Sequence, residues 1–353
     1  NYMSKPEAKR MARFTQLAVV SAQEAMGDAG FTLDEAEADR CGVIVSSGIG
    51  GLFLTEAEHD KGKEKGWDRV SPFYIPMGIC NMAAGQIAIH TGFRGMCTCP
   101  VTACTGGTNA VGDAFHYIRD GYADVMLCGG AESAVTPLAI GAFTSMRALT
   151  QNPDPNRASI PFDAERSGFV LGEGAAILLL EELEHAQARG ARIYAEIVGY
   201  GATCDAYHMT APRPDGSGGA KAMEMALADG GVKPDQVDYI NAHGTSTPLN
   251  DASETTAVKT VFGGHAYQLA ISSTKSMTGH MLGAAGAVEA LFCAKTLEEG
   301  YLPATINYQV PDPACDLDVV PNQGRSADVR YALSNSLGFG GHNGSLLFKK
   351  WEA

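Results

Sequence analysis

The sequence predicts an α/β fold whose sheets are largely buried. Short apolar runs typical of buried strands alternate with longer runs whose apolar residues recur at helical spacing. With 353 residues, of which 45% are hydrophobic, the chain can bury a large core, enough for two packed halves. Its 42 glycines fall in short clusters at the ends of predicted elements, where they favour tight turns and close helix packing.

The predicted strands and helices alternate along the chain, which favours layers of helices packed on sheets. Apolar runs predict strands at residues 41–45, 125–129, 176–180, 195–199, 237–240 and 269–272. Periodicity and a high content of Ala, Leu and Glu predict helices at residues 7–29, 105–121, 219–230, 250–262 and 283–298.

One short pattern occurs twice and indicates two similar halves. An apolar strand, a small turn carrying a reactive residue and an Ala/Gly-rich helix follow one another around residues 104–107 and again around 280–287. The charged segment 181–192, in which Gly190 can cap a helix, is the best candidate for the boundary. We therefore expect one half at residues 1–191 and the other at 192–353.

The charge of the chain argues against several classes of function. A formal net charge of -14 disfavours binding to nucleic acid or to an anionic membrane, because phosphate repulsion is not offset globally. A local basic cluster remains near the start, at Lys5, Lys9, Arg10 and Arg13. No signal peptide and no unbroken apolar stretch of about 18 residues is visible, so a cytoplasmic protein is expected.

The chain has nine cysteines, an odd number scattered along the sequence, and we interpret them as free thiols in a reducing cytosol. Cys97 and Cys99 stand too close in sequence for a zinc pair, so no metal site is expected. No Gly-x-Gly-x-x-Gly pattern follows a predicted strand, which argues against a nicotinamide enzyme, and there is no Walker loop.

Cys104 is the most informative of these thiols. A small turn follows it, and then an amphipathic run in which Ala110, Val111 and Ala114 recur at helical spacing. At a helix start, unpaired backbone N–H groups and the helix dipole favour a thiolate, which is a nucleophile. Without partners, Cys104 would be only one more core thiol.

Two histidines stand at the carboxyl ends of predicted strands, where α/β sheets place their ligands. His243 lies within residues 241–248 and His280 ends the segment 273–280, each among small residues. A single histidine in such a turn is usually only hydrogen-bonded, but a pair in matching positions together with Cys104 favours catalysis. Lys275 adds charge nearby, and Glu289 sits on a helix face so apolar that its carboxylate should be paired.

A glycine-rich loop at residues 338–341 completes the set of candidates. Its backbone N–H groups can stabilise an oxyanion, although glycine-rich turns are common and the signal alone is weak. We interpret His342 as a loop residue rather than as a third catalytic histidine.

In this order, residues 102–104, 241–248, 275–280 and 338–341 resemble the β-ketoacyl-[acyl-carrier-protein] synthases, the condensing enzymes of bacterial fatty-acid synthesis. The resemblance spans essentially the whole chain and extends to residues 47–51, 123–126, 129–132, 161–163 and 205–210. It implies a thiolase-like duplicated α/β fold in five layers, α-β-α-β-α. Ile49 and the loop at 338–341 look most like the elongating, type II members.

The resemblance also implies a decarboxylative Claisen condensation. Cys104 would carry the acyl chain, and the backbone N–H groups of Cys104 and Phe339 would form the oxyanion hole beside Gly338. His243 and His280 would stabilise the enolate formed when malonyl-acyl-carrier protein loses CO2. Lys275, together with Glu289, would orient the groups on the His280 side of the site and balance their charge.

Further positions are implied by the same resemblance. Thr245 and Thr247 would bond the 4'-phosphopantetheine arm, which arrives on the acyl-carrier protein, so no other cofactor is expected. Phe339 would act as a gate, and Ile49 and Phe143 would line the acyl channel. Lys5, Lys9, Arg10 and Arg147 match the family's docking positions for the acidic carrier protein, and a homodimer is expected.

Three alternatives remain open beside fatty-acid elongation. A polyketide-type ketosynthase would run the same chemistry on another carrier. A non-catalytic chain-length partner subunit would lack the nucleophile that Cys104 supplies. A biosynthetic thiolase would have a second cysteine in a glycine-rich loop, whereas the last cysteine here, Cys315, lies in no such loop. The family also has about 60 residues, with a first core strand, before the segment matching Asn1, so the native protein is expected to be longer.

Overall fold

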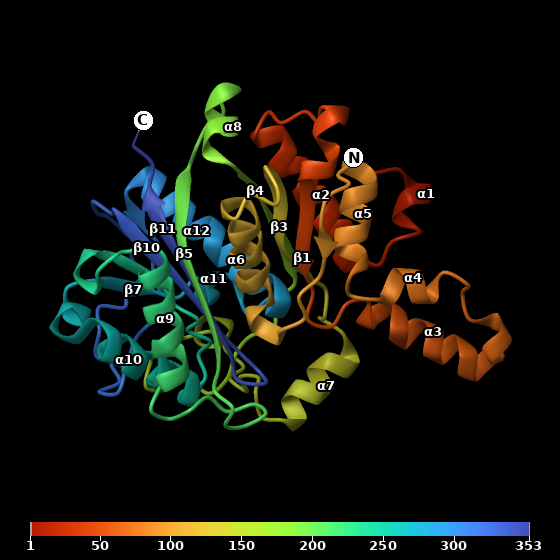
Figure 1. Cartoon of the computed structure of the whole chain (residues 1–353). Coiled ribbons are helices and arrows are strands. Elements are labelled where there is room, and N and C mark those ends of the chain that lie inside the picture. Colours follow the sequence, from red (N-terminus) through yellow and green to blue (C-terminus); the bar gives the residue numbers. More distant parts are fainter. Residues whose placement is uncertain (1, 353) are drawn as a thin grey trace.

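Two β-sheets and three layers of helices form the fold in a computed structural model that describes residues 2–352 (Figure 1). Helices α6 and α12 lie between the sheets and pack against each other. Helices α2 and α5 cover the outer face of the first sheet, and α9 and α10 cover the outer face of the second. This is the five-layered α-β-α-β-α order that the sequence resemblance implies.

The first sheet has the strand order β2-β1-β3-β4, and only its last pair is antiparallel. The second has the order β5-β11-β10-β6-β7, with β6 parallel to both its neighbours. The strands of the first sheet are β1 (Cys41–Ser46), β2 (Cys97–Thr98), β3 (Val125–Glu132) and β4 (Gly174–Glu181). Those of the second are β5 (Ala195–Cys204), β6 (Tyr239–Asn241), β7 (Ala270–Ser272), β10 (Tyr331–Gly338) and β11 (His342–Lys350), and β8 (Tyr301–Leu302) pairs with β9 (Arg325–Ser326) separately.

The helices of the three layers are α2 (Arg13–Asp28), α5 (Met82–Thr91), α6 (Gly106–Arg119), α9 (Ser217–Asp229), α10 (Pro248–Phe262) and α12 (Ala285–Glu299). The others are α1 (Lys5–Ala8), α3 (Leu52–Lys65), α4 (Tyr74–Gly78), α7 (Pro137–Ser145), α8 (Leu183–Ala188) and α11 (Lys275–Thr278). The predicted single helix at 7–29 is wrong, because the chain extends at Ala12 to bury Met11 and Ala12 between α1 and α2. The Gln16 amide donates to the carbonyl oxygens of Ala8 and Met11 across this break.

Three hydrophobic clusters fill the spaces between the layers. One lies between the two sheets, around α6 and α12, and the other two lie under the outer helices of each sheet. The central helices approach so closely that a Cβ on Gly107 would stand 2.7 Å from the backbone nitrogen of Ala287. Glycine at this position therefore brings the amino ends of α6 and α12 side by side.

The repeated sequence pattern corresponds to a repeated turn. A short 3-10 segment, η3 (Ala103–Thr105), leads into α6, and a second, η7 (Leu282–Ala284), leads into α12. Ala103 and Leu282 occupy equivalent places and share a left-handed backbone, with φ of 50° and 46°. The duplication expected from the sequence is thus visible, while the boundary expected at 191/192 stays a prediction.

Two further observations concern classes of site. Among residues 2–352, no helix combines the length and apolarity needed to cross a membrane. No group of His, Cys, Asp and Glu side chains in that part of the chain is arranged to hold a metal ion.

Candidate active site

Cys104 lies in η3, directly before the first turn of α6, and its side chain is buried. The backbone N–H groups of Phe339 and of Cys104 itself point at its sulfur. Phe339 belongs to the turn between β10 and β11, which closes over η3: a Cβ on Gly338 would stand 3.2 Å from the Cys104 nitrogen. The two N–H groups that the resemblance assigns to an oxyanion hole therefore come together from two distant parts of the chain, and that role stays a prediction.

The expectation of a resting thiolate at Cys104 is wrong. Burial raises the pKa of the Cys104 thiol to about 11, although the charge of Lys275 and the N–H of Phe339 act in the opposite direction. Removing the sulfur from water thus outweighs its place at a helix start. Cys104 is therefore a neutral thiol near pH 7.

His243 and His280 lie together beside this thiol site. Their ring centroids are 5.3 Å apart at an interplanar angle of 86°, and Phe169 packs edge-on against His280 at 5.3 Å. His243 follows β6 as expected, whereas α11 intervenes between β7 and His280. Burial and the nearby charge of Lys275 lower the pKa of both imidazoles well below its ordinary value, so both are neutral at pH 7.

Lys275 is the group of this site that forms an ion pair. Its Nζ lies 3.4 Å from Nδ1 of His243 and forms a buried ion pair with Glu289. The hydrogen bond of Lys275 goes to His243, while its charge also acts on His280, so its expected role on the side of His280 stays a prediction. The pairing expected for Glu289 is confirmed, and burial raises the pKa of its carboxyl to about 7 against the charge of Lys275.

Glu254 is a residue of the site that the sequence reasoning missed. Its carboxylate accepts the backbone N–H groups of His243 at 2.8 Å and of Gly244 at 2.9 Å. Burial raises the pKa of Glu254 to about 7, although these N–H groups lower it. Glu254 thus fixes the turn that carries His243. The sequence did offer one signal for Glu254, because its carboxylate lies in the middle of a predicted helix with many small residues.

The apolar side of the site contains both residues expected in the acyl channel. Ile49 and Phe143 pack, with Leu171, against a buried cluster of Cys104, Ala134 and Leu282. Phe143 also stacks edge-on against Phe169, with ring centroids 5.4 Å apart. This wall leaves the sulfur in hydrocarbon surroundings suited to an acyl chain.

The two threonines expected at the pantetheine arm lie on the turn after His243. Their hydroxyl oxygens are 2.9 Å apart, and Thr247 is the residue before α10. Phe339 is half-buried. The geometry places these side chains beside the histidine turn, and their roles toward a pantetheine arm remain predictions.

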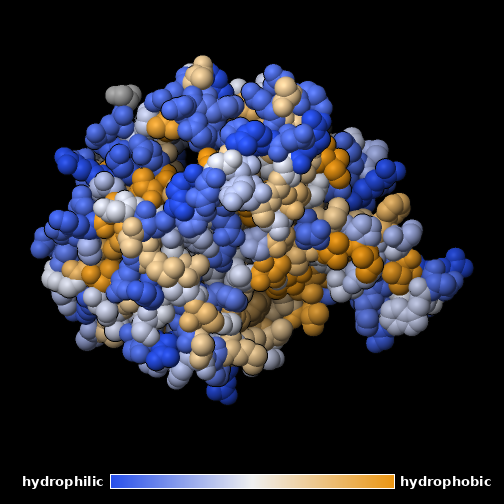
Figure 2. All heavy atoms as spheres, in the orientation of Figure 1, coloured by the Kyte–Doolittle hydropathy of each residue, from blue (hydrophilic) through white to orange (hydrophobic). Residues whose placement is uncertain are grey.

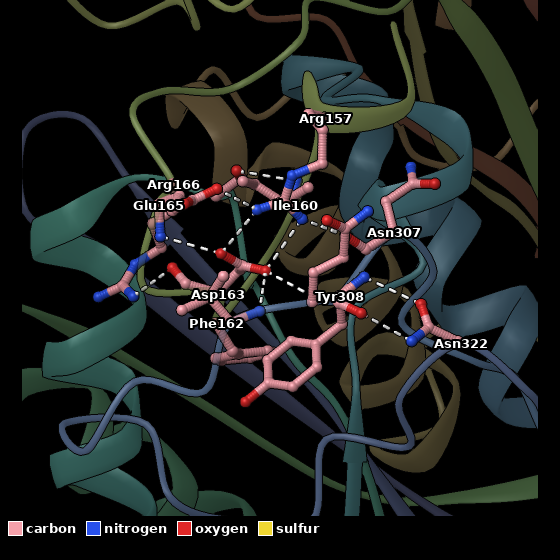
Figure 3. Close-up of polar contacts among 12 residues, drawn as sticks. Arg157, Ile160, Phe162, Asp163, Glu165, Arg166, Asn307, Tyr308 and Asn322 are labelled. Carbon is pink, nitrogen blue, oxygen red and sulfur yellow. Dashed lines mark hydrogen bonds and ion pairs between the residues drawn. The ribbon is translucent and has the colours of Figure 1, made fainter. Parts of the chain in front are cut away.

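A buried ionic network holds the segment that supports this turn (Figure 3). Arg157 donates two hydrogen bonds of 3.0 Å to Asp163, which also accepts the backbone N–H groups of Gln309 and Val310. From the same segment, Arg166 donates to the carbonyl oxygen of Thr247 at 3.2 Å. The sequence showed residues 161–163 as a family motif without indicating this role.

The four predicted docking residues are all exposed. Lys5 lies in α1, Lys9 and Arg10 follow it, and Arg147 comes shortly after α7. Figure 1 shows α1 and α7 at separate places on the molecule, so the four cations fall into two groups. Their role toward a carrier protein stays a prediction.

Comparison with known proteins identifies the family of this chain. The family model for the beta-ketoacyl synthase N-terminal domain matches residues 2–186, and the model for the C-terminal domain matches residues 194–309. The chain therefore belongs to the beta-ketoacyl synthase family, as the sequence resemblance implies.

Two curated relatives are similar over their shared length. The "3-oxoacyl-[acyl-carrier-protein] synthase 2" of Synechocystis sp. is 54% identical over 99% of this chain and 85% of its own. The protein of the same name from Staphylococcus aureus is 53% identical over 100% of this chain and 85% of its own. Their names bear out the resemblance to type II members.

Solved structures confirm the thiolase-like fold. A type II PKS acyl-carrier protein in complex with its ketosynthase bound to the hexaketide (AntDE:AntF) matches with a TM-score of 0.93 and 39% identity, covering 96% of this chain and 85% of that one. A beta-ketoacyl synthase from Burkholderia phymatum STM815 matches with a TM-score of 0.91 and 37% identity, covering 99% and 85%.

Proposed function

We propose that this protein elongates acyl chains by decarboxylative Claisen condensation, as an acyltransferase that takes malonyl-acyl-carrier protein as its second substrate. The main support is the convergence of Cys104, two neutral imidazoles and two backbone N–H groups on one buried site. The relatives at 53% and 54% identity carry a name that states this reaction class.

In the first half-reaction, Cys104 Sγ attacks the carbonyl carbon of an acyl thioester. A new C–S bond forms, the old C–S bond breaks, and the thiol proton is passed through a neutral imidazole to the departing pantetheine sulfur. The N–H groups of Cys104 and Phe339 hold the oxyanion meanwhile. Because the Cys104 pKa is about 11, this coupled proton transfer is needed near pH 7.

In the second half-reaction, the malonyl group loses CO2 as its C–C bond breaks. The electron pair moves onto the thioester as an enolate, whose oxygen accepts N–H donation from His243 and His280. The carbanion carbon then attacks the acyl group, a C–C bond forms, and Cys104 leaves as a thiolate that takes up one proton. Burial and the charge of Lys275 keep both pKa values low, and the neutral imidazoles can donate without repelling Lys275.

Lys275 determines which ring nitrogen of His243 donates. An ammonium group has only donors, so Nδ1 of His243 must accept from it and Nε2 must carry the proton. His280 Nδ1 is buried without a hydrogen-bond partner among residues 2–352.

The 4'-phosphopantetheine arm enters as part of the substrate. We assign Thr245 and Thr247 to it because their hydroxyl groups lie on the turn after His243. Phe339 is the gate, since it is half-buried and its own N–H reaches Cys104. No further cofactor enters this scheme.

An acidic acyl-carrier protein is the proposed partner. An enzyme with net charge -14 needs local cations to attract it, and the exposed Lys5, Lys9, Arg10 and Arg147 supply them. The solved type II ketosynthase at 39% identity was captured with its own carrier protein. That structure also supports the second candidate, a polyketide-type ketosynthase with the same chemistry, but the higher identity of the fatty-acid relatives favours elongation.

We also propose a homodimer. Figure 2 shows apolar side chains gathering on the face that carries α4 and α7. Exposed apolar residues there include Phe73, Ile75, Leu138 and Ile140, and the edge strand β2 leaves one side unpaired. Sedimentation equilibrium should give twice the mass of one chain, and Ile140→Asp should shift it toward the monomer. A monomeric wild-type protein would contradict this proposal.

We place the reaction in the cytoplasm, where all nine cysteines would stay reduced and malonyl-carrier protein is consumed. The nine thiols are unpaired in the structure, as a reducing compartment requires. Fractionation of cells producing the protein tests this point.

The reaction is tested with acyl-carrier protein and malonyl-carrier protein as substrates. The wild type should form β-ketoacyl product, and intact mass should show one acyl group on Cys104. Cys104→Ala should lose acylation by at least about a thousandfold while keeping malonyl decarboxylation. The matched control, Cys293→Ala, removes a buried thiol of the middle layer and should keep acylation. Acylation at another cysteine would contradict the assignment of Cys104 as the nucleophile.

A further inference from the structure

Glu132 ends β3 with a fully buried carboxylate that no part of the reaction uses. Its Oε2 accepts the backbone N–H groups of Gly48 at 2.7 Å and Gly283 at 3.1 Å. Its Oε1 accepts the N–H of Ile49 at 3.2 Å and the hydroxyl of Ser47 at 3.0 Å. Four donors thus converge on one carboxylate.

No cationic side chain among residues 2–352 forms an ion pair with Glu132. Burial raises the pKa of the Glu132 carboxyl, and the N–H groups of Gly48, Gly283 and Ile49 lower it. A buried carboxylate held only by N–H and O–H donors is costly, because nothing neutralises its charge locally. Such a group is retained where its geometry matters.

The donors belong to two turns that meet at the sulfur. Ile49 follows Gly48 and Leu282 precedes Gly283; Leu282 belongs to the buried apolar cluster that contains Cys104, and Ile49 packs against this cluster. The turns are in direct contact, since a Cβ on Gly283 would stand 2.5 Å from the Gly48 nitrogen. Glu132 therefore ties together the wall from the first half of the fold and the wall from the second.

Leu282 is held in a conformation that needs such a tie. Its φ of 46° is left-handed, a backbone conformation that strains a leucine and persists only when the surroundings fix it. The hydrogen bond from the adjacent Gly283 N–H to Glu132 is the polar contact that anchors this turn to the opposite one.

From this geometry we propose that Glu132 is a positioning residue that sets the acyl-chain selectivity of the Cys104 pocket, by fixing the Ile49 and Leu282 walls together. The inference rests on the proposed function. A short acyl group fills only the space beside the sulfur, whereas a long one must pass the walls farther in. If the walls are loose, a long chain must order them as it binds, and that ordering opposes binding.

The test compares acylation of Cys104 by hexanoyl-carrier and myristoyl-carrier protein. Glu132→Gln keeps the size of the side chain but replaces one acceptor oxygen by a donor that faces N–H groups. The ratio of myristoyl to hexanoyl rate should fall roughly tenfold. Malonyl decarboxylation, which needs no acyl chain, should stay within about twofold of the wild type.

Glu181→Gln is the matched control. Glu181 lies on β4 opposite Val125, at the other end of the same strand pair, and its buried carboxylate pairs with Arg189. This variant should lower stability without changing the ratio of the two acylation rates.

If Glu132→Gln fails to fold, Ser47→Ala provides the milder change. It removes one donor to Glu132 and should lower the same ratio roughly threefold. Equal losses for both chain lengths, or a ratio equal to that of Glu181→Gln, would overturn the inference. A wild type that accepts neither acyl group would instead refute the proposed function.

Discussion

The ammonium nitrogen of Lys275 lies 3.4 Å from Nδ1 of His243. The same ammonium group pairs with Glu289, and all three side chains are buried. One positive charge therefore holds one imidazole in one tautomer, while Glu289 offsets the charge that the interior would otherwise exclude. The sequence patterns around His243 and His280 predict equivalent positions for the two rings. The contact with Lys275 distinguishes His243 from His280.

Replacing Lys275 by Met should damage condensation more than folding. The neutral side chain keeps the length, but His243 loses the donor that fixes its tautomer, so condensation should fall about a hundredfold. The deprotonation of Cys104 should become harder too, since the charge of Lys275 lowers its pKa. Single-turnover condensation from preformed acyl-enzyme measures the first effect.

Lys221→Met is the control for Lys275→Met, because Lys221 is an exposed lysine on α9 paired with Glu224. It should leave condensation unchanged. Full activity in Lys275→Met would show that the contact with His243 has no catalytic consequence.

Glu254→Gln should disturb His243 through the backbone. One of the two N–H groups, from His243 or Gly244, would face an amide donor instead of a carboxylate oxygen. We expect decarboxylation to fall about tenfold to a hundredfold while acylation of Cys104 changes little, because Cys104 contacts neither N–H group. Parallel assays of both half-reactions check this, and an equal loss in both would indicate a general loss of structure.

The raised pKa of Cys104 predicts how alkylation depends on pH. A thiol with a pKa of about 11 is almost fully protonated at pH 7, so its reaction with iodoacetamide should rise about tenfold per pH unit up to roughly pH 10. Peptide mapping of the label at Cys104 measures the rate. A plateau beginning near pH 7 would show a resting thiolate.

Asp163 should make the fold sensitive to acid. Burial alone would raise its pKa, but the hydrogen bonds from Arg157, Val310 and Gln309 outweigh it and lower the pKa to about 2. Its stabilisation is present above the unfolded-state pKa near 4 and is lost as the pH falls through 2. The difference corresponds to about 2 kcal/mol.

Asp163→Asn should therefore unfold at lower urea concentration at pH 7 and show a flatter stability profile between about pH 4 and pH 2 than the wild type. Equal pH slopes for the two proteins would contradict the low pKa of Asp163. An exposed carboxylate changed to its amide, Asp60→Asn, serves as control.

The alternation of apolar runs and helical periodicity predicted helices packed on sheets, and the resemblance implied their five-layered order. The turn after β6 holds His243 as predicted, whereas α11 intervenes between β7 and His280. The reactive roles of Cys104, His243 and His280 stay predictions. Side-chain direction is not encoded in such patterns, so the contact of Lys275 with His243 was not foreseen. The thiolate expectation failed because a helix start says nothing about how deeply Cys104 is buried.

Glu132 and Glu254 were missed for one shared reason. Most of their hydrogen bonds come from backbone N–H groups, to Glu132 from turns distant in sequence and to Glu254 from the turn before its own helix. Backbone donors leave no pattern in the sequence. The predicted helix at 7–29 failed differently, because burial of Met11 and Ala12 overrode a helical pattern. Tertiary packing decided each of these positions.

The hairpin of β10 and β11 closes over η3, where the Thr105 hydroxyl donates to the His342 carbonyl oxygen at 3.3 Å, a contact that spans 237 residues of sequence. Such a distant pairing forms late during folding, and later still during synthesis on the ribosome. Until the hairpin docks, the sulfur of Cys104 lacks both its cover and the backbone N–H of Phe339. The order of synthesis therefore delays the pocket around Cys104 until residues 331–350 have been made.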